Sequence, residues 1–120
     1  MKIRTDFITN SSSSSFVVFG AYLDTILSKK ELEKFNELED DWDYIEEKTG
    51  DTNLEYAFIY GEHGADNCGV GIRIVKLMQI YPDAKLSEIK EIVANEINTA
   101  FKSKLKENDI WYIEESWRDG

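Results

Sequence analysis

The residues with the greatest chemical variety lie in one stretch, GEHGADNCG, at positions 61–69. This stretch holds His63, Asp66 and Cys68, which include the one histidine and the one cysteine of the chain. A thiol becomes a nucleophile when an imidazole within hydrogen-bonding distance takes its proton, and a carboxylate can orient that imidazole. The spacing of His63 and Cys68 permits such a pair without requiring it. One hypothesis is therefore a thiol hydrolase or transferase.

The same stretch also has a plainer interpretation. Cys68 keeps strand spacing with Val70 and Ile72, which is typical of a small buried apolar side chain. One histidine, one cysteine and two carboxylates at these spacings match no closed zinc motif. The glycines form neither the dinucleotide-binding nor the P-loop pattern. We therefore predict no catalytic residues, no metal and no cofactor, and keep the thiol enzyme as the alternative.

Charge provides a second candidate site. The chain has 24 acidic and 14 basic residues, a formal charge of −10. Much of the excess lies in ELEDDWDYIEEKTGD, at positions 37–51. This run is either the solvent-exposed face of a helix or a surface that attracts a basic partner or imitates a nucleic-acid backbone. The candidate binding residues of this run are Glu39, Asp40, Asp41, Asp43, Glu46 and Glu47.

The charge and the aromatic residues together indicate the kind of partner. A net charge of −10 repels phosphate backbones and anionic lipid surfaces, so we predict neither nucleic-acid binding nor membrane binding. Trp117 lies near the chain end and is a candidate interface anchor. The expected partner is another protein or a second copy of the chain, bound by a small acidic interaction module.

Sequence features also indicate a cellular location. No apolar run of signal-peptide length follows Lys2 and Arg4, and no apolar run approaches the length of a membrane span. A single cysteine excludes an internal disulfide. We therefore expect a cytoplasmic protein.

Two helices are expected to position these residues. The first covers residues 28–49, with Ser28 as N-cap, Glu31 completing a capping box and an apolar stripe that includes Trp42 and Ile45. The second covers residues 86–105, with Ser87 as its cap. Each helix has one apolar stripe, so both should cover a sheet.

Strand patterns occur at 16–23, 54–60 and 109–117. The first is apolar on both faces, which predicts a strand covered on both sides. Residues 69–81 fit either period: we favour a strand from Gly69 to Val75, while the alternative makes 70–81 a third helix. The resulting order, β-α-β-β-α-β, predicts an α+β two-layer sandwich of the ferredoxin-like type in a single domain, 15–120. One sheet face would stay open unless the leader or a second copy covers it.

Residues 1–14 form a polar, flexible leader before that domain. Its residues Arg4, Asp6 and Phe7, followed by Thr9, Asn10 and the serines 11–15, resemble the opening of a group of small bacterial and phage-associated proteins. That resemblance implies no activity. The leader is either a solvated tether, because serine hydroxyls compete for backbone hydrogen bonds, or a recognition tag in which Arg4, Asp6 and Phe7 are read by a partner. Modification of the serines is a third possibility.

Overall fold

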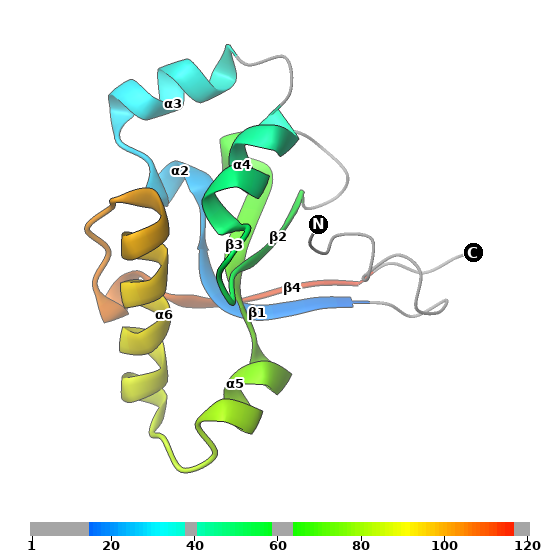
Figure 1. The fold of residues 1–120 in the computed structure, drawn as a ribbon, viewed down its shortest axis with the longest axis vertical. Coiled ribbons are helices and arrows are strands. Elements are labelled where there is room, and N and C mark those ends of the chain that lie inside the picture. Colours follow the sequence, from blue (N-terminus) through cyan, green and yellow to red (C-terminus); the bar gives the residue numbers. More distant parts are fainter. Residues whose placement is uncertain (1–14, 38–40, 59–63, 117–120) are drawn as a thin grey trace.

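The computed structural model describes residues 15–37, 41–58 and 64–116 (Figure 1). The predicted leader, with its candidate tag residues, lies outside this part of the chain. The strands are β1 (Ser15–Tyr22), β2 (Glu55–Phe58), β3 (Cys68–Arg73) and β4 (Trp111–Ser116). The helices are α2 (Leu23–Ile26), α3 (Lys29–Asn36), α4 (Asp41–Thr49), α5 (Ile74–Ile80) and α6 (Leu86–Phe101), with short 3-10 turns at Ala65–Asn67 (η2) and Glu107–Asp109 (η3).

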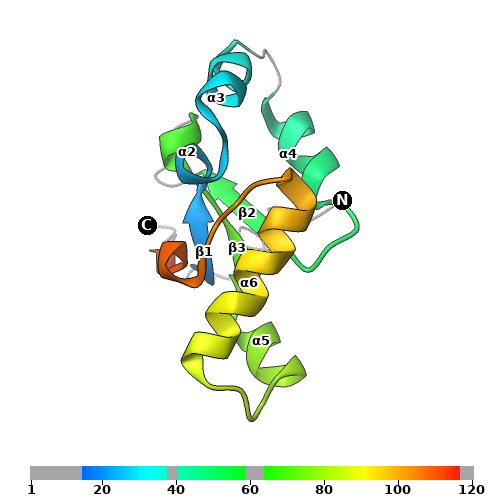
Figure 2. The same cartoon turned by 90° about the vertical axis from the view of Figure 1, so that its left-hand side faces the viewer.

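The four strands form one sheet in the order β2-β3-β1-β4, and every neighbouring pair is antiparallel. In β1, Phe19 lies opposite Ile72 of β3 on one side and Tyr112 of β4 on the other. Helix α6 crosses one face of this sheet (Figures 1 and 2). The predicted α+β two-layer class is confirmed, although the chain has more helices than the six-element order expected.

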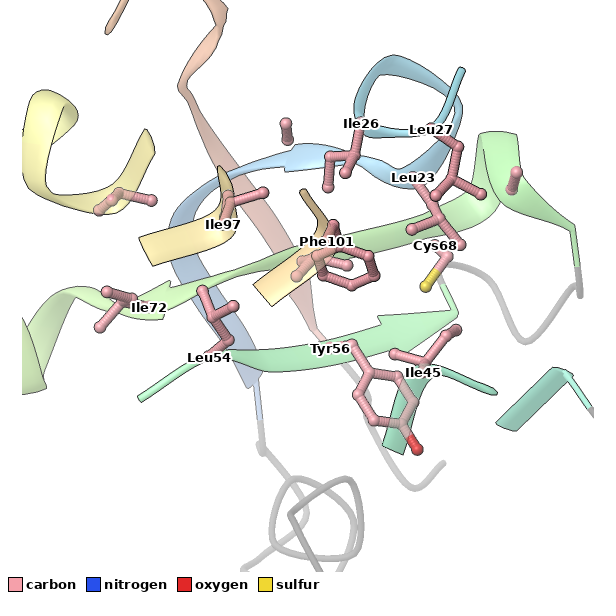
Figure 3. Close-up of a cluster of buried hydrophobic side chains, with 14 of the residues drawn as sticks. Leu23, Ile26, Leu27, Ile45, Leu54, Tyr56, Cys68, Ile72, Ile97 and Phe101 are labelled. Atoms are coloured by element: carbon pink, nitrogen blue, oxygen red, sulfur yellow. The ribbon is translucent and has the colours of Figure 1, made fainter. Parts of the chain in front are cut away.

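The main core lies between the sheet and the helices (Figure 3). Ile97 and Phe101 of α6 pack against strand residues of this face, including Tyr56 and Ile72. Helix α4 joins the same layer, because Trp42 contacts the rings of Tyr56 and Phe58 at centroid distances of 5.7 and 4.7 Å. The apolar stripes of the two predicted helices therefore face the sheet, as expected.

The prediction of one continuous helix over 28–49 is wrong. Helix α3 ends at Asn36 and α4 begins at Asp41. The start was predicted correctly: Ser28 Oγ accepts from the Glu31 N–H at 3.3 Å, and Glu31 Oε1 accepts from the Ser28 N–H at 3.0 Å. Crowded carboxylates and low helix propensity of aspartate disfavour a continuous helix here. The break lets α3 and α4 approach the core separately.

Helix α6 begins at Leu86, as predicted, but its N-cap and its C-terminal end differ from the prediction. Its N-cap is Lys85, whose N–H donates to the Glu88 carboxylate at 2.8 Å, so the cap predicted at Ser87 is wrong. It ends at Phe101 rather than at the predicted residue 105, and its C-cap Lys102 has φ 57°, in the left-handed region. The Asn98 side chain fixes the loop beyond: its Oδ1 accepts from the Leu105 N–H at 2.8 Å and its Nδ2 donates to the Leu105 carbonyl at 2.9 Å.

Both alternatives for residues 69–81 are partly correct. The first residues form β3 and the last form α5, with the change between Arg73 and Ile74. Val75, predicted as the end of the strand, belongs to the helix. The apolar pattern could not locate this change because Val70 and Ile74 fit both the strand spacing and the helical spacing.

The sheet bends where β1 crosses β3. Gly20 and Gly71 lie opposite each other, and a Cβ built on Gly71 would lie 2.2 Å from the Phe19 carbonyl oxygen. Figure 1 shows β1 running beside β4 and then turning up along β3. Only glycine permits this close crossing of two backbones.

The bend closes part of the sheet face opposite α6, which was expected to remain open. Phe16, Val18, Ala57 and Ile113 form a second buried cluster there. A Cβ on Gly69 would lie 3.3 Å from Ile113 Cγ2 and 3.4 Å from Phe16 Cε2, so these side chains pack directly over Gly69. The two-sided apolar pattern of β1 is explained by a core on each of its faces.

Candidate interaction surfaces

The predicted acidic surface on α4 is only partly available. Asp43 and Glu47 are exposed. Glu46 is half-buried, and its Oε1 accepts a hydrogen bond from the Tyr56 hydroxyl at 2.9 Å. Glu46 is therefore committed to holding α4 against β2. Asp41 begins α4, but its side chain lies outside the described residues, as do Glu39, Asp40 and the predicted anchor Trp117.

Tyr44 lies where α3 meets α4 and connects the acidic surface to the core. Its ring packs edge-on against Phe35 at 5.6 Å between centroids, and Lys48 Nζ lies 5.6 Å from the Tyr44 ring centroid. Burial, with smaller effects from the carboxylates of Glu31 and Glu47, raises the pKa of Tyr44. Tyr44 is therefore a neutral neighbour of the acidic residues at physiological pH.

The candidate thiol site is not an accessible site in this conformation. Cys68 is completely buried at the start of β3, opposite Phe58, within the cluster that includes Leu23 and Ile45 (Figure 3). Asp66 is exposed, and His63 lies outside the described residues. A substrate could reach the thiol only if the core opened. The thiol-enzyme alternative remains a prediction, and alkylation of Cys68 without denaturant would support it.

The described residues also bear on metal binding and on membrane insertion. Within residues 15–37, 41–58 and 64–116, no group of three or more histidine, cysteine or acidic side chains could hold a metal ion. In the same part of the chain, no helix combines the length and the apolar character needed to cross a bilayer.

An open pocket of about 460 Å³ lies between the α2–α3 turn and the loop after α6. Its wall combines the apolar side chains of Ile26 and Leu105 with charges of both signs, including Lys104 and Asp109. Glu31, also on this wall, is already used to cap α3. Because charges of both signs line this pocket, it favours neither an anionic nor a cationic ligand.

Helix α5 has an unusual exposed surface. It is apolar nearly all round, a pattern typical of a buried helix, yet Leu77 is its one fully buried residue. It extends below the sheet, away from α3 and α4 (Figure 1). We define the α5 surface as the exposed apolar residues of α5, of the turn that follows and of the first position of α6: Val75 (65% exposed), Met78 (63%), Ile80 (45%), Tyr81 (37%) and Leu86 (54%).

A second exposed apolar feature lies on β4. Trp111 is 66% exposed and Tyr112 is 54% exposed. They lie on opposite faces of the sheet, because successive strand residues alternate. The Tyr112 hydroxyl donates to Glu114 Oε1 at 3.0 Å, and mainly this bond raises the pKa of Tyr112.

Comparisons with protein-family models, curated proteins and solved structures found no match to this chain. The resemblance of the leader to bacterial and phage-associated proteins therefore stays a prediction. Sequence reasoning proposed the acidic run and missed both exposed apolar surfaces. The continuous apolar character of α5 pointed toward burial, so the pattern carried no signal that could have revealed its exposure.

Proposed function

We propose that the protein is a small acidic, cytoplasmic protein-interaction module that contacts its partner through the α5 surface. The observation that carries this proposal is the exposure of Val75 and Met78 on a helix anchored by Leu77. Large apolar side chains gathered in one short part of a chain are typical of a protein–protein interface. Methionine and aromatic residues are also enriched at such interfaces.

Burial of the α5 surface would provide the driving force. Removing apolar surface from water contributes about 25 cal/mol per Å². The flexible side chain of Met78 can adapt to an uneven partner surface, while the ring of Tyr81 offers both apolar contact and a hydroxyl. Binding at this surface would therefore respond weakly to salt.

The acidic residues would determine which partners approach. Asp43 and Glu47 are exposed on α4, and the chain carries a charge of −10. Like charges repel over about 10 Å at moderate salt, whereas basic partners are attracted. The proposed partner is thus a neutral or basic protein. Self-association remains the alternative for the same apolar surface.

Site-specific photocrosslinking tests the proposal. A photoreactive residue at Met78 should form adducts with one protein in cells of the source organism, and the same residue at Thr99, an exposed position on α6, should not. Capture at Met78 should persist when salt is raised. Identical adducts from both positions would contradict the proposal, and adducts between copies of the chain would identify a homo-oligomer.

A further inference from the structure

The β4 edge carries acidic residues but, within its own sequence, neither of the two residue types that protect a sheet edge most strongly, lysine and proline. Among the described strands, β4 pairs with β1 on one side and has no strand on the other. Natural edge strands are commonly protected by charged side chains, above all lysine, and by proline, a bulge or short length. β4 has the sequence WYIEES over six residues, without lysine or proline. Its backbone is therefore suited to pair with a further strand.

Two aromatic side chains flank the first residues of this edge. Trp111 lies opposite Gly20 and Tyr112 lies opposite Phe19 in the pairing of β4 with β1. The side chains of Trp111 and Tyr112 therefore extend from opposite faces of the sheet. The Tyr112 ring packs edge-on against Phe19 at 6.3 Å, which fixes its position, yet more than half of it is exposed. A strand added beside β4 would cover both aromatic side chains, one on each face of the sheet.

Charge decides between the possible occupants of this edge. Glu114 is exposed and follows Tyr112 on the same face, and Glu115 is the next residue. Two copies of a chain with a charge of −10 repel each other. Opposite charges in cross-strand positions attract, and like charges in those positions repel. A cationic strand therefore fits this edge better than a second β4.

We propose that β4 binds an extended cationic segment of a partner protein by strand addition. Apolar side chains of that segment would pack on Trp111 and Tyr112, and a lysine or arginine would lie opposite Glu114. This surface is distinct from the α5 surface and does not depend on it. The backbone would provide much of the affinity, and Glu114 would select the charge.

The first experiment titrates the full, ¹⁵N-labelled chain with a short synthetic peptide of alternating valine and lysine. We expect chemical-shift changes in the amides of 111–116 and slower hydrogen exchange there. The same peptide with N-methylated backbone amides should not bind, because it cannot pair with the edge. No change at β4 at about 1 mM peptide, or equal binding of the methylated peptide, would overturn the proposal.

The second experiment tests the charge selection. Glu114→Lys should weaken binding of the lysine peptide about fivefold and favour a matched valine–glutamate peptide. The control, Glu91→Lys, makes the same change of net charge at an exposed position on α6 and should have little effect. Equal losses in both variants would show a general charge effect and refute the role of Glu114.

The remaining experiment tests the second-copy alternative. Amide exchange in β4 is measured without peptide at increasing protein concentration, alongside sedimentation velocity. We expect a monomer with concentration-independent exchange. Protection of 111–116 that grows with concentration would show that a second chain occupies the edge, and the proposed cationic partner would then be wrong. The photocrosslinking at Met78 is unaffected by this outcome.

Discussion

Gly71 shows how one residue type determines the shape of the sheet. Opposite Gly20, it allows the backbones of β1 and β3 to cross so closely that a Cβ would lie 2.8 Å from Gly20 Cα. Because of this crossing, the first half of β1 lies over Gly69, where Phe16 packs. The second core depends on this bend, since Phe16 and Ile113 are buried on the inside of it.

Gly71→Ala is therefore expected to destabilise the fold strongly, by about 3 kcal/mol. Its Cβ would meet backbone atoms, which cannot rotate away. The matched control is Gly69→Ala on the same strand and face, where the Cβ meets side-chain atoms at 3.3 and 3.4 Å and should cost about 1 kcal/mol. Urea denaturation measures both. Equal losses would contradict a special role for the crossing.

At the same scale, the candidate site residues were only partly predictable. The spacing of Cys68 with Val70 and Ile72 correctly predicted burial, because strand periodicity reports which side chains face the core. The hydrogen bond from Tyr56 to Glu46 was not predictable, because it joins β2 to α4 across a tertiary contact. No local pattern distinguishes Glu46 from its exposed neighbour Glu47.

At the scale of elements, the two predicted helix caps make a direct comparison. Ser28→Ala should cost about 1 kcal/mol, since Ser28 Oγ satisfies the Glu31 N–H at the start of α3. Ser87→Ala should cost less than about 0.5 kcal/mol, because Ser87 lies within the first turn of α6 and Lys85 is the N-cap. Thermal unfolding of the two variants measures this difference. A larger loss at Ser87 would contradict the observed start of α6.

Low pH should weaken the capping box formed by Ser28 and Glu31 at the start of α3. The Ser28 N–H donates to the Glu31 carboxylate, and mainly this bond holds the pKa of Glu31 below its ordinary value. A lowered pKa means that the stabilisation is present above the ordinary carboxyl pKa and is lost as pH falls through the lowered one. The Ser28 amide shift should therefore titrate with Glu31.

Glu31→Gln provides the control for this titration. Its amide oxygen can still accept from the Ser28 N–H, but it does not ionise. The pH dependence of the Ser28 amide shift should disappear in this variant while the helix start remains. If the titration persists in Glu31→Gln, another group controls the cap and the assignment to Glu31 is wrong.

The type of an element was predictable where its apolar residues followed only the helical spacing or only the strand spacing. The helical stripe around Val93 and Ile97 located α6, and alternation located β2. The division of 68–80 into β3 and α5 was not predictable, because Val70 and Ile74 fit both the strand spacing and the helical spacing. The exposure of α5 was missed for a related reason: burial depends on what the fold places beside a helix, and apolar residues in sequence cannot report that.

At the scale of the whole molecule, the charge of −10 should make the folded state repel itself. Raising salt from about 10 mM to about 150 mM shortens the screening length from about 30 Å to about 8 Å. The urea midpoint should therefore rise. This repulsion also bears on the proposed cationic partner of β4, because binding of a positive segment would relieve it.

Two variants with opposite charge changes test whether repulsion causes the salt response. Replacing Asp43 and Glu47 by lysine takes the charge from −10 to −6 and should reduce the response, whereas replacing Lys104 and Lys106 by glutamine takes it to −12 and should increase it. All four side chains are exposed, so packing changes little. If the three proteins respond equally, salt acts through something other than net charge, and repulsion between copies can no longer be used to exclude a second chain at the β4 edge.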